Sequence, residues 1–333
     1  MKKLILITIF SAAFGQTNAQ TKYSTLDSSF VDFHRNIYHA NRMCNKDSFL
    51  QAYAKYSFAF ENYKGAVNPS HYYKTALCAL KIKEEFRALY YLQKAVVGGF
   101  EIDSLRKKEI SFYNKNTKKE YQDNLPKWQK SVKEKRNATW QTELNTYNEE
   151  YKKSLTSTYK NAFEYCTTCL KNPKCSKTAP EYTSKYKLIK ERSKADSTAA
   201  THLFSRIKEY GFPNLTLLDK NAFDIARNIL LNFDADKKNE YLNDLLINAL
   251  KNGYISPEFY ASIIDRRNLI NGLAPIFYEP ITGYEKTIGK ELNVANQKRK
   301  SIGLYPIVIQ TKTPAKDPKA KVQKPIGETT YDY

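Results

Sequence analysis

The sequence contains none of the motifs that mark the common enzyme classes. A nucleophile elbow, a Walker loop, a Rossmann glycine run and a His-Glu-x-x-His zinc pair are all missing. Beyond the first residues, no apolar run is long enough to cross a bilayer. The sequence therefore implies no reaction and no cofactor. It leaves catalysis undecided and favours a role without it.

The one continuous apolar segment lies at the amino terminus. Lys2 and Lys3 precede an apolar stretch from Leu4 to Phe14, which is too short to span a membrane, and Thr17-Asn18-Ala19 suits cleavage. No cysteine stands at the cleavage site, so we expect no lipoprotein anchor. Residues 1–19 are predicted to be a signal peptide. The mature protein is expected in the periplasm or outside the cell, without a transmembrane segment.

The charge balance is strongly basic, with 54 Lys and Arg against 34 Asp and Glu and a formal net charge of +20. Such a balance favours weak contact with anionic surfaces such as lipid headgroups or polysaccharide. Lysines that only solvate helix surfaces explain the same composition. Basic residues alternate with Tyr and Trp near residues 118–128, a pattern that can stack bases. No nucleic-acid motif accompanies them, so we expect no specific nucleic-acid partner.

Residues 20–102 show a helix-turn-helix pattern in which small and large apolar residues alternate. The positions that fit a tetratricopeptide repeat are Tyr72, Ala76, Ala88, Leu92 and Ala95. Ala54 and Phe58 come one repeat length, about 34 residues, before two of them. The pattern predicts tetratricopeptide-like helical hairpins. Such arrays bind peptides or proteins on a concave face, and the alternative is that these helices only brace the next domain.

The next segment, residues 103–195, is rich in lysine, glutamate and tyrosine and has weak periodicity. Trp128 and Trp140 are its main apolar anchors. We expect long, partly exposed helices that bridge the two halves of the chain.

The five cysteines are Cys44, Cys78, Cys166, Cys169 and Cys175. Export favours disulfides, and the Cys-x-x-Cys pair has no βαβ pattern around it, which argues against a thioredoxin-like site. Zinc would need a fourth ligand, and none of the four histidines is close in sequence to this pair. A local disulfide between Cys166 and Cys169 is favoured over a metal or an active thiol pair. Cys44 and Cys78 lie one repeat length apart and could pair across neighbouring helices.

Residues 196–306 carry three amphipathic patterns joined by short loops. Gly211-Phe212-Pro213 ends a preceding helix. Apolar residues then recur at helical spacing over 221–233 and 242–250. Ser256-Pro257 has the form of an N-cap followed by proline at the first helical position. These patterns predict a compact helical domain, and the chain as a whole is expected to be all-α.

This stretch resembles domain-of-unknown-function family 6624, which is found in secreted proteins of Bacteroidetes-type bacteria. The family pattern runs from Tyr-Gly-Trp-Pro through a Tyr-Leu helix, Asp-Arg and a glycine to Arg-x-x-Ile-Gly-Leu-x-Pro. The matching residues here are Tyr210, Gly211, Pro213, Tyr241, Leu242, Asp265, Arg266, Gly272, Arg299, Ile302, Gly303 and Leu304. The resemblance implies the same compact domain over residues 196–306.

The chain departs from the family pattern at its most polar positions. Asn232-Phe233 stand where the family has Gln-His, and Pro275–Pro280 stand where it has Gln-x-Tyr-Gly-Thr-Gln. The groups best suited to proton transfer are therefore missing from this chain.

Asp265-Arg266 is the only constellation here that could form a site. A carboxylate beside an arginine can orient a substrate or act as a base, but such pairs more often bind helix ends and loop carbonyls. We expect the structural role, with both side chains directed at the backbone of the irregular loop 271–280.

The chain is thus predicted to divide into a signal peptide (1–19), tetratricopeptide-like repeats (20–102), a bridging segment (103–195), a helical domain (196–306) and a disordered Lys/Pro-rich tail (307–333). The function it favours is that of an exported scaffold that binds a peptide or protein partner in the cell envelope. The alternative is a hydrolase-like envelope enzyme whose site lies between the repeats and the helical domain.

Overall fold

All regular structure in the described part of the chain is helical, which confirms the predicted all-α class. The computed structural model describes residues 26–154, 161–162, 164–165, 180–232, 240–270, 274–278 and 291–307. The predicted signal peptide, the Cys-x-x-Cys loop and nearly all of the tail lie outside these ranges. Within them, no helix combines the length and the apolarity needed to cross a bilayer.

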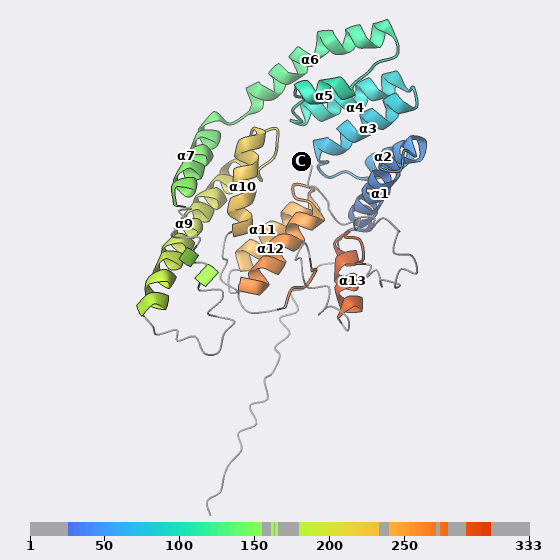
Figure 1. Ribbon diagram of the computed structural model, residues 1–333. Coiled ribbons are helices and arrows are strands. Elements are labelled where there is room, and N and C mark those ends of the chain that lie inside the picture. The colour runs from blue at the N-terminus through green and yellow to red at the C-terminus, as the bar shows by residue number, and fades with distance from the viewer. Residues whose placement is uncertain are drawn as a thin grey trace, which may run out of the picture.

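The first four helices form two stacked hairpins. They are α1 (Ser28–Cys44), α2 (Phe49–Asn62), α3 (Pro69–Lys81) and α4 (Glu85–Val97). Each helix packs on the next one in the chain (Figure 1). This arrangement is a short, repeat-like helical array.

The buried positions of the two hairpins repeat with a spacing that differs from the predicted one. Ala54 and Phe58 are exposed, so the register that assigned them to the helix interface is wrong. The buried positions that correspond between α2 and α4 are instead each 36 residues apart: Ala52 and Ala88, Tyr56 and Leu92, Ala59 and Ala95. Small residues in these pairs let the packed helices approach closely.

The middle of the chain bridges the hairpins to the carboxy-terminal helices. It comprises α5 (Ser104–Glu109), α6 (Lys115–Lys135), α7 (Ala138–Ser154) and α9 (Pro180–Tyr210). Helix α6 packs on α4, and α7 packs on α9. In Figure 1 these helices continue the arc that the hairpins begin.

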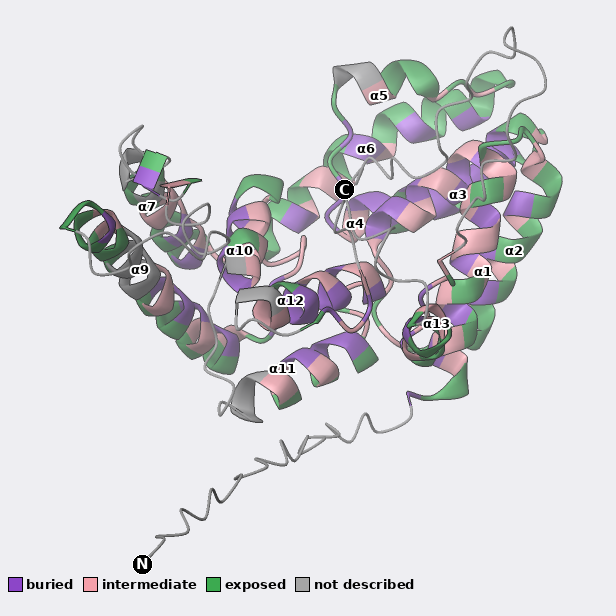
Figure 2. Ribbon diagram, turned by 60° about the horizontal axis from the view of Figure 1, so that its bottom comes forward, coloured by how far each residue is buried: buried purple, intermediate pink, exposed green. Residues whose placement is uncertain are grey.

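The three helices predicted for the carboxy-terminal region are all present. They are α10 (Lys220–Asn232), α11 (Glu240–Lys251) and α12 (Pro257–Ile270), and they are followed by α13 (Leu292–Ser301). Both views place α12 between the hairpins on one side and α9 and α10 on the other (Figures 1 and 2). The carboxy-terminal helices therefore occupy the inside of the arc.

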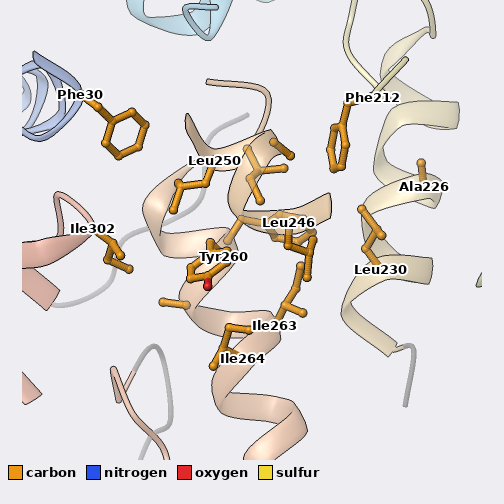
Figure 3. Packing of buried hydrophobic residues seen from close by; sticks show 14 of the residues in the cluster. Phe30, Phe212, Ala226, Leu230, Leu246, Leu250, Tyr260, Ile263, Ile264 and Ile302 are labelled. Atoms are coloured by element: carbon orange, nitrogen blue, oxygen red, sulfur yellow. The ribbon is translucent and has the colours of Figure 1, made fainter. Parts of the chain in front are cut away.

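One apolar core joins α1 and α2 to α10, α11, α12 and the segment that follows α13. The cluster extends from Leu26 to Leu304 and includes buried residues of α1, α2, α9, α10, α11 and α12. Figure 3 shows Leu250 and Tyr260 at its centre, with Phe30 of α1 on one side and Leu230 of α10 on the other. The hairpins and the carboxy-terminal helices are thus held together by shared burial.

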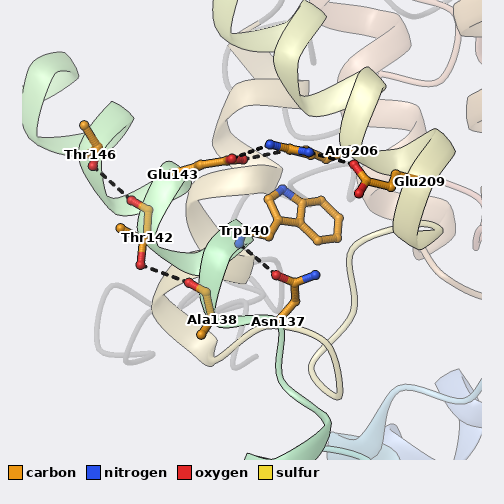
Figure 4. A network of polar contacts seen from close by, with 8 residues as sticks. All are labelled: Asn137, Ala138, Trp140, Thr142, Glu143, Thr146, Arg206 and Glu209. Atoms are coloured by element: carbon orange, nitrogen blue, oxygen red, sulfur yellow. Dashed lines mark hydrogen bonds and ion pairs between the residues drawn. The ribbon is translucent and has the colours of Figure 1, made fainter.

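Trp140 attaches α7 to α9. It is 1% exposed, and its ring lies 5.8 Å from that of Tyr210. Beside it, Arg206 donates from Nε to Glu143 at 2.9 Å and from Nη1 to Glu209 at 2.6 Å (Figure 4). Ion pairs as exposed as these contribute little to stability. The buried indole is therefore the stronger attachment.

Candidate binding pocket

A pocket of about 380 Å³ lies where the hairpins meet the carboxy-terminal helices. We call it the junction pocket. Its lining residues come from α1, α3, α10, α12 and the turns between helices: Phe33, His34, Ala66, Val67, Asn68, Pro69, His71, Gly98, Asn214, Leu215, Thr216, Phe223, Arg227, Gly253, Tyr254, Ile255, Ser256 and Phe259. Neither half of the chain forms this pocket alone.

Aromatic side chains make up much of its wall. Phe33 and Phe259 are buried, and Phe223 packs against the same core. Tyr254 is partly exposed and stacks on Phe212, with ring centroids 6.1 Å apart. Because Phe33, Phe223 and Phe259 belong to the shared core or pack against it, this part of the pocket wall is held by the junction itself.

Two histidines of the hairpins line the pocket without a hydrogen-bond partner at one ring nitrogen. Each residue keeps some exposed surface, but Nε2 of His34 and Nδ1 of His71 are buried and unpartnered among the described residues. Burial lowers the pKa of His34 to about 3. Burial also lowers the pKa of His71 to about 3, with smaller contributions from Lys74 and His34. Both rings are therefore neutral at pH 7.

Arg227 of α10 brings a positive charge to the same wall. Its guanidinium lies 4.4 Å from the ring centroid of Phe259 and 5.7 Å from that of Phe223. It takes part in further interactions as well. Contacts with two rings hold the group in one place, because a guanidinium stacks favourably on an aromatic face.

Two helices begin at the pocket. Asn68 caps α3 and accepts from the Ser70 amide at 3.0 Å. Ser256 precedes α12, and its hydroxyl accepts from the Phe259 amide at 3.2 Å. The cap at Ser256-Pro257 was predicted from the sequence, and Asn68-Pro69, which was not, has the same form of a capping residue before proline.

Asp265 and Arg266, the predicted pair, lie outside the junction pocket and do not act together. Asp265 is completely buried and accepts from the amides of Ile276 at 2.6 Å and Phe277 at 2.9 Å. Arg266 is exposed. The arginine that reaches this loop is Arg299, which donates to the Phe277 carbonyl at 2.7 Å.

The residues that carry the family resemblance are spread over the carboxy-terminal region. Tyr210 is partly buried beside Trp140, Gly211 ends α9 and Pro213 is buried. Tyr241 belongs to α11, and Gly272 lies outside the described residues.

Gly303 follows α13, and a β-carbon placed on it would lie 3.1 Å from Cβ of His34. Next to it, Tyr305 stacks on Tyr38 of α1 with centroids 3.4 Å apart. The Tyr305 hydroxyl is also 2.6 Å from Nε2 of His39. The segment after α13 is therefore packed on α1, next to one of the pocket histidines.

Cys44 and Cys78 lie together, as their spacing suggested. Their sulfur atoms are 3.0 Å apart, and both are free thiols. The other cysteines, Cys166, Cys169 and Cys175, fall outside the described ranges. Among the described residues, no group of three or more His, Cys, Asp or Glu is arranged to hold a metal ion.

Comparison with known protein families, curated proteins and solved structures finds no match to this chain. The resemblance to family 6624 and the tetratricopeptide likeness therefore remain predictions.

Sequence patterns did not identify the junction pocket. In the sequence, the histidines suggest at most zinc ligands, and Arg227 is one basic residue among many. They meet because the hairpins pack on the carboxy-terminal helices, a long-range contact with no local signature. The signal that was available is the pair of helix starts, at Asn68-Pro69 and Ser256-Pro257.

Proposed function

We propose that this protein is an exported helical scaffold that binds a peptide or protein partner in the cell envelope, and that the junction pocket anchors that partner. The observation that supports the proposal is that one concave, mostly apolar site is formed jointly by the repeat-like hairpins and the carboxy-terminal helices. Largely preformed pockets of this kind, with a few polar groups, are the usual form of binding sites.

The lining of the pocket favours binding over the alternative of an envelope hydrolase. An enzyme that used the candidate pair Asp265 and Arg266 would need further polar groups around it. Asp265 instead accepts two backbone amides through one oxygen, and Arg266 is exposed. Within the described part of the chain, the lining of the junction pocket includes no carboxylate, cysteine or lysine. A nucleophile paired with a base is therefore not formed by these residues.

The envelope location in this proposal comes from the predicted signal peptide. The net charge of +20 adds a weak attraction to anionic surfaces, which would concentrate the protein near lipid or polysaccharide. The pocket would then supply the specific contact.

Partner capture with a filled pocket tests the proposal. Ala66 lines the pocket and is exposed, so Ala66→Trp places a large side chain at its edge. Ala54→Trp is the matched control, because Ala54 is exposed on α2 and is not part of the lining. Proteins captured from envelope extract by the parent and by the control should be lost with Ala66→Trp. If Ala66→Trp retains all of them while melting like the parent, the pocket is not the anchor.

A further inference from the structure

We propose that the junction pocket binds an apolar residue bearing a free carboxylate, which in a peptide is the carboxy-terminal residue. This inference rests on the proposed function and names the chemistry of its ligand. The same chemistry is found in a free apolar carboxylic acid, so the experiment below separates the two sources.

The first support is the convergence of two helix amino termini. Helices α3 and α12 start at Pro69 and Pro257, and their caps, Asn68 and Ser256, both line the pocket. The amino terminus of a helix carries a partial positive charge of roughly half an elementary charge. The caps already accept the Ser70 and Phe259 amides. The two helix termini therefore contribute a positive electrostatic potential to the pocket more than they contribute free N–H donors.

The second support is the guanidinium of Arg227. The rings of Phe259 and Phe223 hold it against the pocket wall. A guanidinium has five N–H donors in a fixed plane and matches a carboxylate in geometry. It can therefore serve a bound carboxylate alongside its other interactions.

The third support is the absence of negative charge from the lining. No Asp or Glu occurs among the described residues that line the pocket, and Glu258, in the first turn of α12, is not part of the lining. His34 and His71 are neutral at pH 7 because burial lowers the pKa of each to about 3. Among the described lining residues, Arg227 is therefore the one that carries a charge at pH 7, and that charge is positive.

The unpartnered nitrogens of the two histidines are a separate indication of a ligand. Buried polar atoms without a partner are uncommon in folded proteins. Nε2 of His34 and Nδ1 of His71 are two such atoms in one pocket. A neutral imidazole keeps one N–H donor, so a polar ligand group that reached these rings would relieve an unfavourable burial.

The rest of the pocket surface is mostly apolar and favours an apolar side chain on the ligand. Phe33, Phe259 and Ile255 are buried side chains in the wall, and the volume of about 380 Å³ lies in the range of small-ligand pockets. An extended peptide could place its last residue in the pocket. An internal residue would have peptide backbone on both sides of it that the pocket would also have to accommodate. A terminal residue suits the site better.

Binding of defined peptides tests the inference. The probes are fluorescein-labelled Gly-Ser-Gly-Ser-Gly-Phe with a free carboxylate, the same peptide as its amide, and a peptide with Phe at an internal position. Unlabelled N-acetylphenylalanine and its amide serve as competitors. We expect the free acid to bind at least about tenfold more tightly than the amide, the loss for one charge-assisted hydrogen bond. N-acetylphenylalanine should compete, and its amide should not.

Arg227→Met provides the variant test, and Arg42→Met is its control, because Arg42 also lies over an aromatic ring but is not part of the lining. The preference for the free acid should disappear in Arg227→Met and persist in Arg42→Met. The competitor arms use only the parent protein, so they hold if Arg227→Met fails to fold.

Three results would overturn parts of this picture. Equal affinity for the free acid and the amide rejects the carboxylate inference and leaves peptide binding standing. Saturable binding of N-acetylphenylalanine but of no peptide supports the carboxylate pocket and rejects the peptide partner. Binding of neither rejects both.

Discussion

Asp265 and Arg299 hold the backbone of the same residue, Phe277, from two different helices. The Asp265 carboxylate accepts from the Phe277 amide at 2.9 Å, and the Arg299 guanidinium donates to the Phe277 carbonyl at 2.7 Å. Arg299 also donates through Nε to the Tyr305 carbonyl at 2.6 Å. Two mostly buried charged side chains thus satisfy a loop that has few regular partners of its own.

Removing either side chain should destabilise the protein. Asp265→Ala leaves the Ile276 and Phe277 amides without an acceptor, and Arg299→Ala leaves two carbonyls without a donor. An unsatisfied buried polar group costs about 1–3 kcal/mol. Urea unfolding should show losses of that size. Arg266→Ala is the matched control, since Arg266 is exposed, and its change should stay within about 0.5 kcal/mol. An equal loss in the control would contradict the assignment.

Much of this arrangement could be predicted from the sequence, because the signals for it are local. Helical periodicity, the Ser256-Pro257 cap and the glycine after α9 place α10, α11 and α12 close to where they lie. The structural use of Asp265 was also predictable, since it follows the apolar pair Ile263-Ile264. The arginine that shares this loop with Asp265 was not predictable. Adjacent residues on a helix point about 100° apart, so Arg266 faces solvent when Asp265 is buried, and Arg299 arrives from a helix far along the chain.

The junction pocket could not be predicted from local sequence signals. Nothing local distinguishes Arg227 from the other basic residues, and its role depends on Phe259, which comes from another helix. The predicted 34-residue repeat register is wrong for a related reason. A fixed repeat length placed Ala54 in the interface, but the face of α2 that is buried is chosen by its packing on α1 and α3.

The buried histidines should make the fold sensitive to mild acid. Burial lowers the pKa of His34 and of His71 to about 3 in the folded protein, from about 6.5 in the unfolded chain. At pH 7 both rings are neutral in the folded protein and mostly neutral in the unfolded chain. Below pH 6.5 the unfolded chain takes up protons that the folded protein does not, so stability falls as the pH falls towards 3. At pH 5 the loss is about 2 kcal/mol for each ring.

Urea unfolding at pH 5, 6 and 7 measures this dependence over a range in which ordinary carboxylates stay ionised. His34→Asn and His71→Asn should each flatten the fall in stability between pH 7 and pH 5. His202→Asn is the control, since His202 is exposed, and it should leave the slope unchanged. A parent protein whose unfolding free energy is the same at pH 5 and pH 7 would show that these rings are not buried in neutral form.

The thiols of Cys44 and Cys78 should close to a disulfide under oxidising conditions. Their sulfur atoms are 3.0 Å apart, and the hydrogen bond from Cys78 lowers the pKa of Cys44 to about 7. The Cys44 thiolate would attack glutathione disulfide and release one glutathione, and Cys78 would then displace the second. The bond would join the end of α1 to α3 and should raise stability by about 2–4 kcal/mol.

Peptide mapping by mass spectrometry checks this without counting the other cysteines. After treatment with glutathione disulfide, the parent should yield a linked peptide containing both residues. Cys44→Ser should yield none and should gain no stability from the treatment. Both residues recovered as free or glutathione-bound thiols in the folded, oxidised parent would refute the pairing.

Two glycines allow the contact between the carboxy-terminal segment and α1 to be measured. Gly211 and Gly303 have nearly the same backbone angle, with φ of +86° and +84°, so alanine at either position suffers the same strain. That strain is roughly 1–2 kcal/mol for a residue with a β-carbon. The surroundings differ, because a β-carbon at Gly211 meets nothing within 4 Å, whereas one at Gly303 lies 3.1 Å from Cβ of His34.

Gly303→Ala should therefore cost more than Gly211→Ala, and the excess reports the packing of this segment on α1. The disturbed packing around Gly303 should also reach the junction pocket, because His34 lines that pocket. Amide exchange of the first half of α1 should rise in Gly303→Ala and stay at the parent level in Gly211→Ala. If the two variants unfold at the same urea concentration, the close contact between Gly303 and His34 relaxes without loss of stability. The segment after α13 then does not stabilise the pocket.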